Sequence, residues 1–180
     1  MTVGERSVLW RGDWQRSYEL CTAREAPGAV LEGTVLLPLA DAPAQVRYLV
    51  EADERWVTRL ARVELGGRVL LLEHDGGGRW LLGGAPRPDL EGCLDVDLGV
   101  TPSTNTLPIR RLGEAGGEVP AAWVRFPELT LERLEQRYTR LGDGRWRYQA
   151  GAFEAELVVD DRGLVVTYGD GLWTTVARSA

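Results

Sequence analysis

The segment Ala29–His74, AVLEGTVLLPLADAPAQVRYLVEADERWVTRLARVELGGRVLLLEH, decides the fold of this 180-residue chain. Runs rich in valine and leucine are separated by glycine, proline and aspartate. Many of them alternate apolar with polar residues, which is the period of a half-buried strand. Gly66 and Gly67 stand between two such runs and can adopt the positive φ angles that a hairpin turn needs. The segment therefore predicts a meander of antiparallel strands.

The same pattern continues on both sides of this segment. About fifteen short β-prone runs at close spacing indicate a meandering antiparallel sheet, a sandwich or a barrel. Helix is expected at one place, where Thr104 would be the N-cap, Pro108 would lie in the first turn and Gly113 would follow the last turn. We predict an all-β chain with at most one or two short helices.

An internal duplication is suggested by one repeated spacing. Tyr48 and Trp56 recur as Tyr138 and Trp146, eight residues apart each time and about half the chain apart. If each segment folds as a hairpin, its two rings face one another across the strands. This predicts a single domain, 1–180, with similar halves of about 1–90 and 91–180; the alternative is a coincidence among hairpins, which resemble each other anyway.

Composition excludes several classes of function. A net charge of -6 and a pI near 5.0 argue against nucleic acid as a partner, because phosphate binding needs clustered positive charge. All 21 positive side chains are arginine. Without lysine, Schiff-base chemistry and a Walker-type phosphate loop are excluded. We expect no cofactor.

Metal and thiol chemistry are equally restricted. A zinc site would need the single histidine, His74, to meet Cys21, Cys93 and a carboxylate from distant segments, without the short paired spacings of zinc sites. We therefore predict no metal site. The two cysteines are expected to be buried free thiols, since a chain of this size needs no disulfide framework.

The sequence predicts neither a signal peptide nor a transmembrane segment. The N-terminal MTVGERSVLWRGDW lacks the apolar core of a signal peptide. No stretch approaches 18 consecutive apolar residues, so no transmembrane segment is predicted. A cytoplasmic location is expected.

Candidate chemistry concentrates in the segment Asp95–Leu112, DVDLGVTPSTNTLPIRRL. Asp95 and Asp97 are separated by one residue on a predicted strand, so their side chains leave the same face. Paired carboxylates suggest a glycosidase, whereas pairing with Arg110 and Arg111 would make them structural. Structural pairing is favoured. The hydroxyl groups lack a nearby base, and the chain has no G-x-S-x-G elbow, so we assign no catalytic residue and expect no enzyme.

The segment Gly92–Leu112 closely resembles the signature of a bacterial family of putative glycolipid-binding proteins, formerly a domain of unknown function. The similarity extends, in the expected order, to LEGTV (31–35), VRYLVEADERWVTR (46–59), QRYT (136–139) and VVDDRGLVVTY (158–168). Ser103 stands where the family usually has a large aromatic residue. The resemblance implies two related halves with antiparallel sheets curled into an open roll or half-barrel, similar in outline to bacterial carriers that shield acyl chains.

The resemblance implies a lipid or glycolipid carrier that holds acyl chains in an apolar groove with a polar rim. The alternative is an interaction protein in which Asp97 and Arg110 form a buried polar clamp between the halves. A glycoconjugate hydrolase ranks last. The oligomeric state is left open. The candidate ligand-binding residues are Asp95, Asp97, Thr101, Thr104, Asn105, Arg110, Arg111, Trp56, Trp80 and Tyr138.

Overall fold

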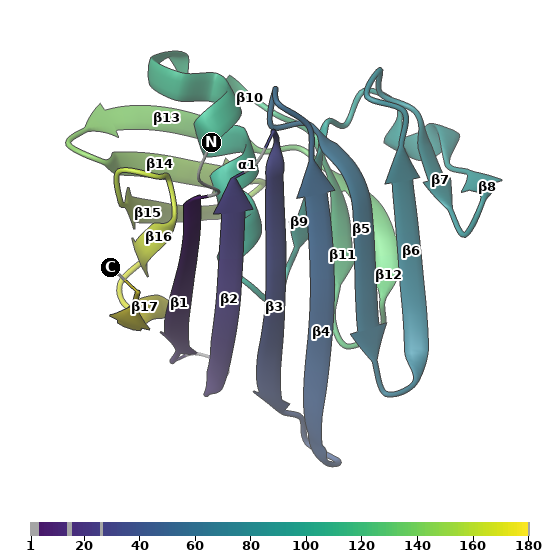
Figure 1. Ribbon diagram of the computed structural model, residues 1–180, viewed down its shortest axis with the longest axis horizontal. Helices are drawn as coiled ribbons and strands as arrows, with labels where there is room; N and C mark the ends of the chain where they lie inside the picture. Colours follow the sequence, from purple (N-terminus) through teal and green to yellow (C-terminus); the bar gives the residue numbers. More distant parts are fainter. Residues whose placement is uncertain (1–3, 14–15, 26, 180) are drawn as a thin grey trace.

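The computed structural model describes residues 4–13, 16–25 and 27–179 (Figure 1). Among these residues the one α-helix is α1 (Thr106–Leu112), and short 3₁₀ turns cover Pro88–Leu90, Ser103–Asn105 and Gly113–Ala115. The strands are β1 (Gly4–Gly12), β2 (Ser17–Glu25), β3 (Ala29–Pro38), β4 (Pro43–Ala52), β5 (Thr58–Leu65), β6 (Arg68–His74), β7 (Trp80–Leu82), β8 (Ala85–Pro86), β9 (Asp95–Leu98), β10 (Gly117–Glu118), β11 (Ala121–Arg125), β12 (Thr130–Leu134), β13 (Arg137–Gly142), β14 (Arg145–Ala150), β15 (Phe153–Val159), β16 (Val165–Tyr168) and β17 (Trp173–Arg178).

One long antiparallel sheet contains 14 of these strands, in the order β10-β13-β14-β15-β16-β17-β1-β2-β3-β4-β5-β6-β7-β8. The pairing of β17 with β1 joins the last strand of the chain to the first. Figure 1 shows the sheet curling from the long strands β1 to β6 toward the crossing strands β13 to β15. The prediction of an all-β fold with a curled, open sheet is confirmed; the internal duplication stays a prediction.

A second, three-stranded sheet has the order β12-β11-β9 and lies behind the long strands in Figure 1. Its strand β9 pairs with β11 in parallel, which the expectation of antiparallel sheets missed. Thr58 of β5 ties the two sheets together. Its N–H donates to the Leu94 carbonyl at 3.0 Å, and its Oγ1 accepts from the Val96 N–H at 3.1 Å. These bonds fix β9 against the long sheet.

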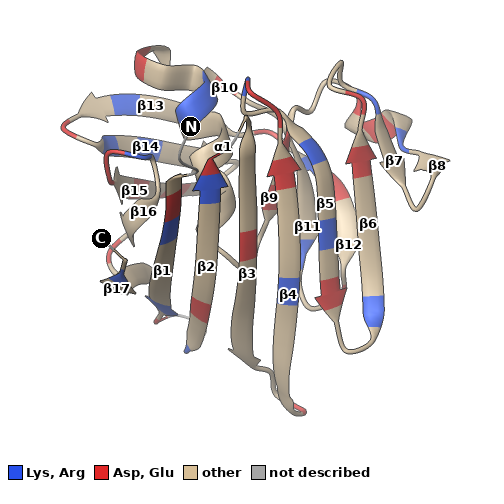
Figure 2. Ribbon diagram, in the orientation of Figure 1, with Lys and Arg blue, Asp and Glu red and all other residues tan. Residues whose placement is uncertain are grey.

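The core lies between the long sheet and the smaller layers. In β3, the side chains of Leu31, Val35 and Leu37 are buried while those of Glu32 and Leu36 are exposed, as alternation on a pleated strand requires. Each large apolar side chain buried in this way contributes about 1.5–3 kcal/mol. Acidic and basic residues are interspersed along the strands (Figure 2). Cys21 and Cys93 are free and buried, as predicted.

The helix and the hairpins differ in detail from their predictions. Gly113 follows α1 with φ +55°, as expected, but the Thr104 side chain is not the cap, because its Oγ1 accepts from the Leu98 N–H at 3.3 Å. Strand pairing places Tyr138 opposite Tyr148 and Trp146 opposite Arg140. The prediction that the rings of Tyr138 and Trp146 face one another across a hairpin is therefore wrong. Across the described residues, no helix is long and apolar enough to cross a membrane.

Candidate functional site

A pocket of about 360 Å³ opens between the small sheet and the C-terminal strands. Five aromatic side chains and one carboxylate define it, and we call it the aromatic pocket. Trp123 comes from β11, Tyr148 from β14, Phe153 from β15, Tyr168 from β16 and Trp173 from β17, with Asp97 of β9 among them. These six residues from six separate strands thus converge on one mostly apolar space.

Three of these rings form a continuous wall. The ring centroids of Tyr148, Phe153 and Tyr168 lie 6.0–6.3 Å apart, within the range of favourable aromatic pairs. Phe153 remains 44% exposed, which places it at the pocket mouth. Trp123 stands beside Asp97 because parallel pairing of β11 with β9 sets these two residues in register.

Asp97 supplies the charge of the pocket. Gln136 donates to its Oδ2 through Nε2, and the same Nε2 lies 3.0 Å from the Tyr148 hydroxyl. Burial is the main cause that raises the pKa of Asp97 to about 6; hydrogen bonds with Gln136 and Tyr148 oppose the rise, and the nearby charge of Asp95 adds to it. The carboxylate is therefore ionised at neutral pH and close to its titration range.

Thr101 and Asn105, two of the predicted ligand-binding residues, also line the pocket. Asn105 accepts from the Tyr138 hydroxyl at 2.7 Å and donates to the Pro102 carbonyl at 3.0 Å, so both ends of its amide are held. Thr101 donates to Glu19 Oε1 at 2.6 Å, deeper in the protein. The predicted residues Asp97, Thr101 and Asn105 are thus brought together at this pocket.

A buried polar cluster lies behind Thr101. Glu19 Oε1 accepts from the Tyr48 hydroxyl, and the Ser103 hydroxyl lies 2.8 Å from those of both Tyr48 and Thr101. The ring of Tyr48 crosses β3 at Gly33, where any Cβ would come within 2.4 Å of the ring. Burial raises the pKa of Glu19 to about 8, so this carboxyl is mostly neutral at pH 7.

Asp95 is not part of the pocket lining. It is 2% exposed and makes a two-point ion pair with Arg111, whose side chain is 14% exposed. Arg111 also donates to the Trp56 carbonyl at 3.3 Å. The structural interpretation of Asp95 is thus confirmed, with Arg111 as the partner.

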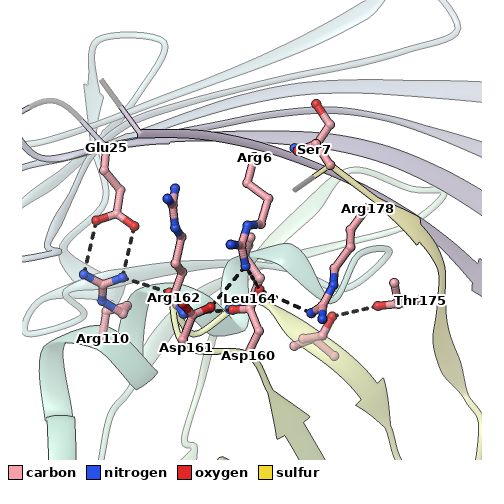
Figure 3. A network of polar contacts seen from close by, with 12 residues as sticks. Arg6, Ser7, Glu25, Arg110, Asp160, Asp161, Arg162, Leu164, Thr175 and Arg178 are labelled. Atoms are coloured by element: carbon pink, nitrogen blue, oxygen red, sulfur yellow. Dashed lines mark hydrogen bonds and ion pairs between the residues drawn. The ribbon is translucent and has the colours of Figure 1, made fainter. Parts of the chain in front are cut away.

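Arg110 faces the carboxylate of Glu25 (Figure 3). It donates to the Glu25 carboxylate at 3.0 and 3.2 Å and to the Arg162 carbonyl at 2.9 Å. Its guanidinium lies 4.3 Å from the centre of the Trp56 ring. The clamp between Asp97 and Arg110, which the sequence offered as an alternative, is therefore wrong. Arg110 and Arg111 are successive residues of α1, so their side chains leave the helix in different directions and reach different carboxylates.

Three further predicted site residues are structural or lie elsewhere. Thr104 is buried under β9. Tyr138 is buried and holds Asn105. Trp80 is buried, donates to the Cys93 carbonyl at 2.9 Å and stacks on His74 with centroids 4.5 Å apart. In the order of the long sheet, β1 to β6 separate its strand β7 from β17, which contributes Trp173 to the aromatic pocket.

A family model described as "Putative glycolipid-binding" matches residues 7–174. The chain belongs to this family. A crystal structure of a DUF1089 family protein from Pseudomonas aeruginosa is similar to it with a TM-score of 0.76 and 36% sequence identity, covering 88% of this chain and 91% of that one. No curated protein matches the sequence significantly.

This member of the glycolipid-binding family also has a second, larger cleft, of about 780 Å³. Trp80 and His74 lie at its apolar floor, and charged side chains such as Arg59, Glu73 and Arg79 surround them. His74 donates through Nδ1 to the Thr58 carbonyl at 2.8 Å and accepts from the Gly78 N–H through Nε2. Both ring nitrogens are thus occupied. Across the described residues, no three His, Cys, Asp or Glu side chains gather as metal ligands would.

Sequence reasoning missed the aromatic wall of this family member. Tyr148, Phe153, Tyr168, Trp123 and Trp173 were not among the predicted site residues. Alternation within β14 marks Tyr148 as inward-facing, but it gives no sign that the five residues share a pocket. The signal that could have found them is the pairing order of the C-terminal strands.

Proposed function

We propose that this protein is a non-catalytic lipid- or glycolipid-binding protein and that its ligand enters the aromatic pocket. Membership of the glycolipid-binding family supports the ligand class. The observation that carries the proposal is the pocket itself, about 360 Å³ in volume and bounded by five aromatic side chains. Concave, mostly apolar spaces with a few convergent polar groups are the usual form of a small-molecule site.

The pocket chemistry suits an amphiphile. Aromatic faces pack against acyl chains and against the apolar faces of sugar rings. Asp97 and Asn105 can accept hydrogen bonds from head-group hydroxyls. The polar rim is accordingly smaller than the sequence suggested, because Arg110, Arg111 and Asp95 are bound elsewhere.

The size of the pocket limits what it holds. A volume of about 360 Å³ lies near the lower end of the range of about 300–1,000 Å³ for ligand pockets. We infer that the pocket takes one end of a lipid or glycolipid and leaves the rest outside. The exposed ring of Phe153 lies where the ligand would leave.

The hydrolase alternative is less well supported. A glycosidase needs two carboxyl groups facing one substrate across a cleft. Only Asp97 of the predicted pair lines the pocket, while Asp95 is buried against Arg111. A binding role needs no second carboxylate.

The cytoplasmic location of the protein stays a prediction.

The test is to purify the natively folded protein, extract it with organic solvent and identify bound lipids by mass spectrometry. An Ala150→Trp variant fills the pocket, because Ala150 lines it on β14. The matched control is Ala177→Trp, on an exposed position of β17. We expect lipid or glycolipid in the wild type and the control, and little in Ala150→Trp. Empty wild-type protein, or equal loading of all three, would overturn the proposal.

A further inference from the structure

The charge of the aromatic pocket is uncompensated. Among the described residues that line it, Asp97 is the only acidic or basic side chain. Asp95 on the same strand, by contrast, is paired with Arg111. Within the described part of the chain, no arginine makes an ion pair with Asp97; its hydrogen-bond partners, the amide of Gln136 and the hydroxyl of Tyr148, are neutral.

An unpaired carboxylate in such a place is costly. A neutral amide supplies one hydrogen bond but leaves the negative charge uncompensated in apolar surroundings. Asparagine at this position would keep the Gln136 contact without that cost. The carboxylate lines the pocket, and its hydrogen-bond partners Gln136 and Tyr148 carry no positive charge. The charge is thus available to a ligand.

The rings around Asp97 suit a cation. Aromatic faces carry negative electrostatic potential and attract ammonium groups placed within about 6 Å of the ring centre. Trp123 already accepts such a contact on one side, where the Arg125 guanidinium lies 5.2 Å from its centroid. The chain as a whole has a net charge of -6, which favours the approach of cations.

We propose that the aromatic pocket recognises a positively charged ammonium group on its ligand, with Asp97 as counter-ion and the surrounding rings as cation–π partners. This inference rests on the proposed function and narrows it, from amphiphiles in general to those that carry an amine or a quaternary ammonium at the buried end. An amino sugar or an amine-bearing lipid head group has this chemistry.

The inference makes binding dependent on pH. Asp97 must be ionised, and its pKa is about 6 without a ligand. The titratable groups near it are Asp95 on its own strand and Tyr138, Tyr148 and Tyr168 from β13, β14 and β16. The pKa values of these tyrosines are raised, so they stay neutral. Affinity for a permanent cation should therefore fall as the pH drops below about 6, because protonated Asp97 carries no charge.

The test compares two probes by isothermal titration calorimetry at pH 7.5, each below its micelle concentration. Octyltrimethylammonium carries a permanent positive charge, and octyl β-glucoside is neutral. The variant Asp97→Asn removes the charge and keeps the shape, and Asp41→Asn removes a charge from an exposed loop. We expect Asp97→Asn to weaken the ammonium probe by about tenfold or more and to weaken the glucoside far less, because the asparagine oxygen still accepts a hydrogen bond from a hydroxyl. We expect Asp41→Asn to affect neither probe.

The outcomes separate this inference from the proposed function. If both probes bind equally well and Asp97→Asn changes neither, the ammonium inference is overturned while a lipid-binding pocket stands. If the ammonium probe binds through Asp97 but extracted protein carries no lipid or glycolipid, the inference stands and the proposed function falls. If neither probe binds, both are overturned. A cooperative melting transition at or above the wild-type temperature shows that Asp97→Asn is folded, because asparagine removes the cost of the buried charge.

Discussion

At the scale of single residues, three enclosed carboxylates illustrate three different solutions to burial. Asp95 is paired with Arg111. Glu19 is held by the hydroxyls of Tyr48 and Thr101 and has a raised pKa. Asp97 has a neutral amide partner and faces a pocket. The sequence singled out Asp95 and Asp97 from their spacing, but Glu19 looked like any polar residue of an alternating strand.

Removing the cation from Asp95 should be strongly destabilising. The variant Arg111→Ala leaves a carboxylate that is 2% exposed without its partner, which costs about 3 kcal/mol or more. The control is Arg137→Ala, whose pair with Glu118 is more than half exposed on both sides and is worth less than about 1 kcal/mol. Urea unfolding measures both. Equal losses in the two variants would refute the buried ion pair.

Glu19 should make the protein less stable as the pH rises. Its pKa is about 8 in the folded protein and near 4.5 when exposed, so the folded state binds an additional proton between these values. Stability therefore falls as the pH rises from about 4.5 to 8, with a limiting slope of about 1.4 kcal/mol per pH unit.

The variant Glu19→Gln keeps the hydrogen-bonding shape and removes this titration. We expect the wild type to lose stability relative to Glu19→Gln by about 1 kcal/mol per unit between pH 6 and 8. The comparison cancels other titrating groups, including His74, whose lowered pKa acts in the opposite sense below pH 6.5. Glu54→Gln, at an exposed position, is the control. Parallel pH profiles for wild type and Glu19→Gln would contradict a neutral Glu19.

At the scale of elements, the segment from β9 through α1 was predicted best. The alternation of apolar and polar residues predicted the strand β9, and Gly113 after the two arginines predicted the end of α1. The pairing partners were not predictable. The parallel neighbour β11 begins 23 residues after β9 ends, and the choice between Arg110 and Arg111 depends on a helix direction that spacing alone does not give.

The helix end at Gly113 should depend on glycine. Its φ of +55° with ψ of -133° is strained for any other residue, while the space around a new Cβ is open. Gly113→Ala should therefore cost about 1–3 kcal/mol through backbone strain alone. Gly77→Ala, at an exposed glycine without a positive φ, should change stability little. Thermal unfolding distinguishes them, and a neutral Gly113→Ala would contradict the described turn.

At the scale of the whole molecule, the sheet order creates the site. Periodicity predicted an antiparallel β fold, and the resemblance predicted its curled, open form. The aromatic pocket needs β9 and β11 of the small sheet beside β14 to β17 of the long one. Residues 97 and 173 are far apart in the sequence and line one pocket only through this arrangement of strands. Such long-range pairing has no local signature, so the wall of the pocket could not be predicted.

The most direct test of a ligand site in the aromatic pocket uses the tryptophan indole N–H signals in a ¹H–¹⁵N spectrum, assigned by Trp→Phe variants. Trp123 and Trp173 line the aromatic pocket, whereas Trp80 lies in the larger cleft and Trp10 donates to the Val165 carbonyl in the core. Titration with octyl β-glucoside should shift the signals of Trp123 and Trp173 saturably and leave those of Trp10 and Trp80 in place. Shifts at Trp80 alone, or none at Trp123 and Trp173, would contradict the account.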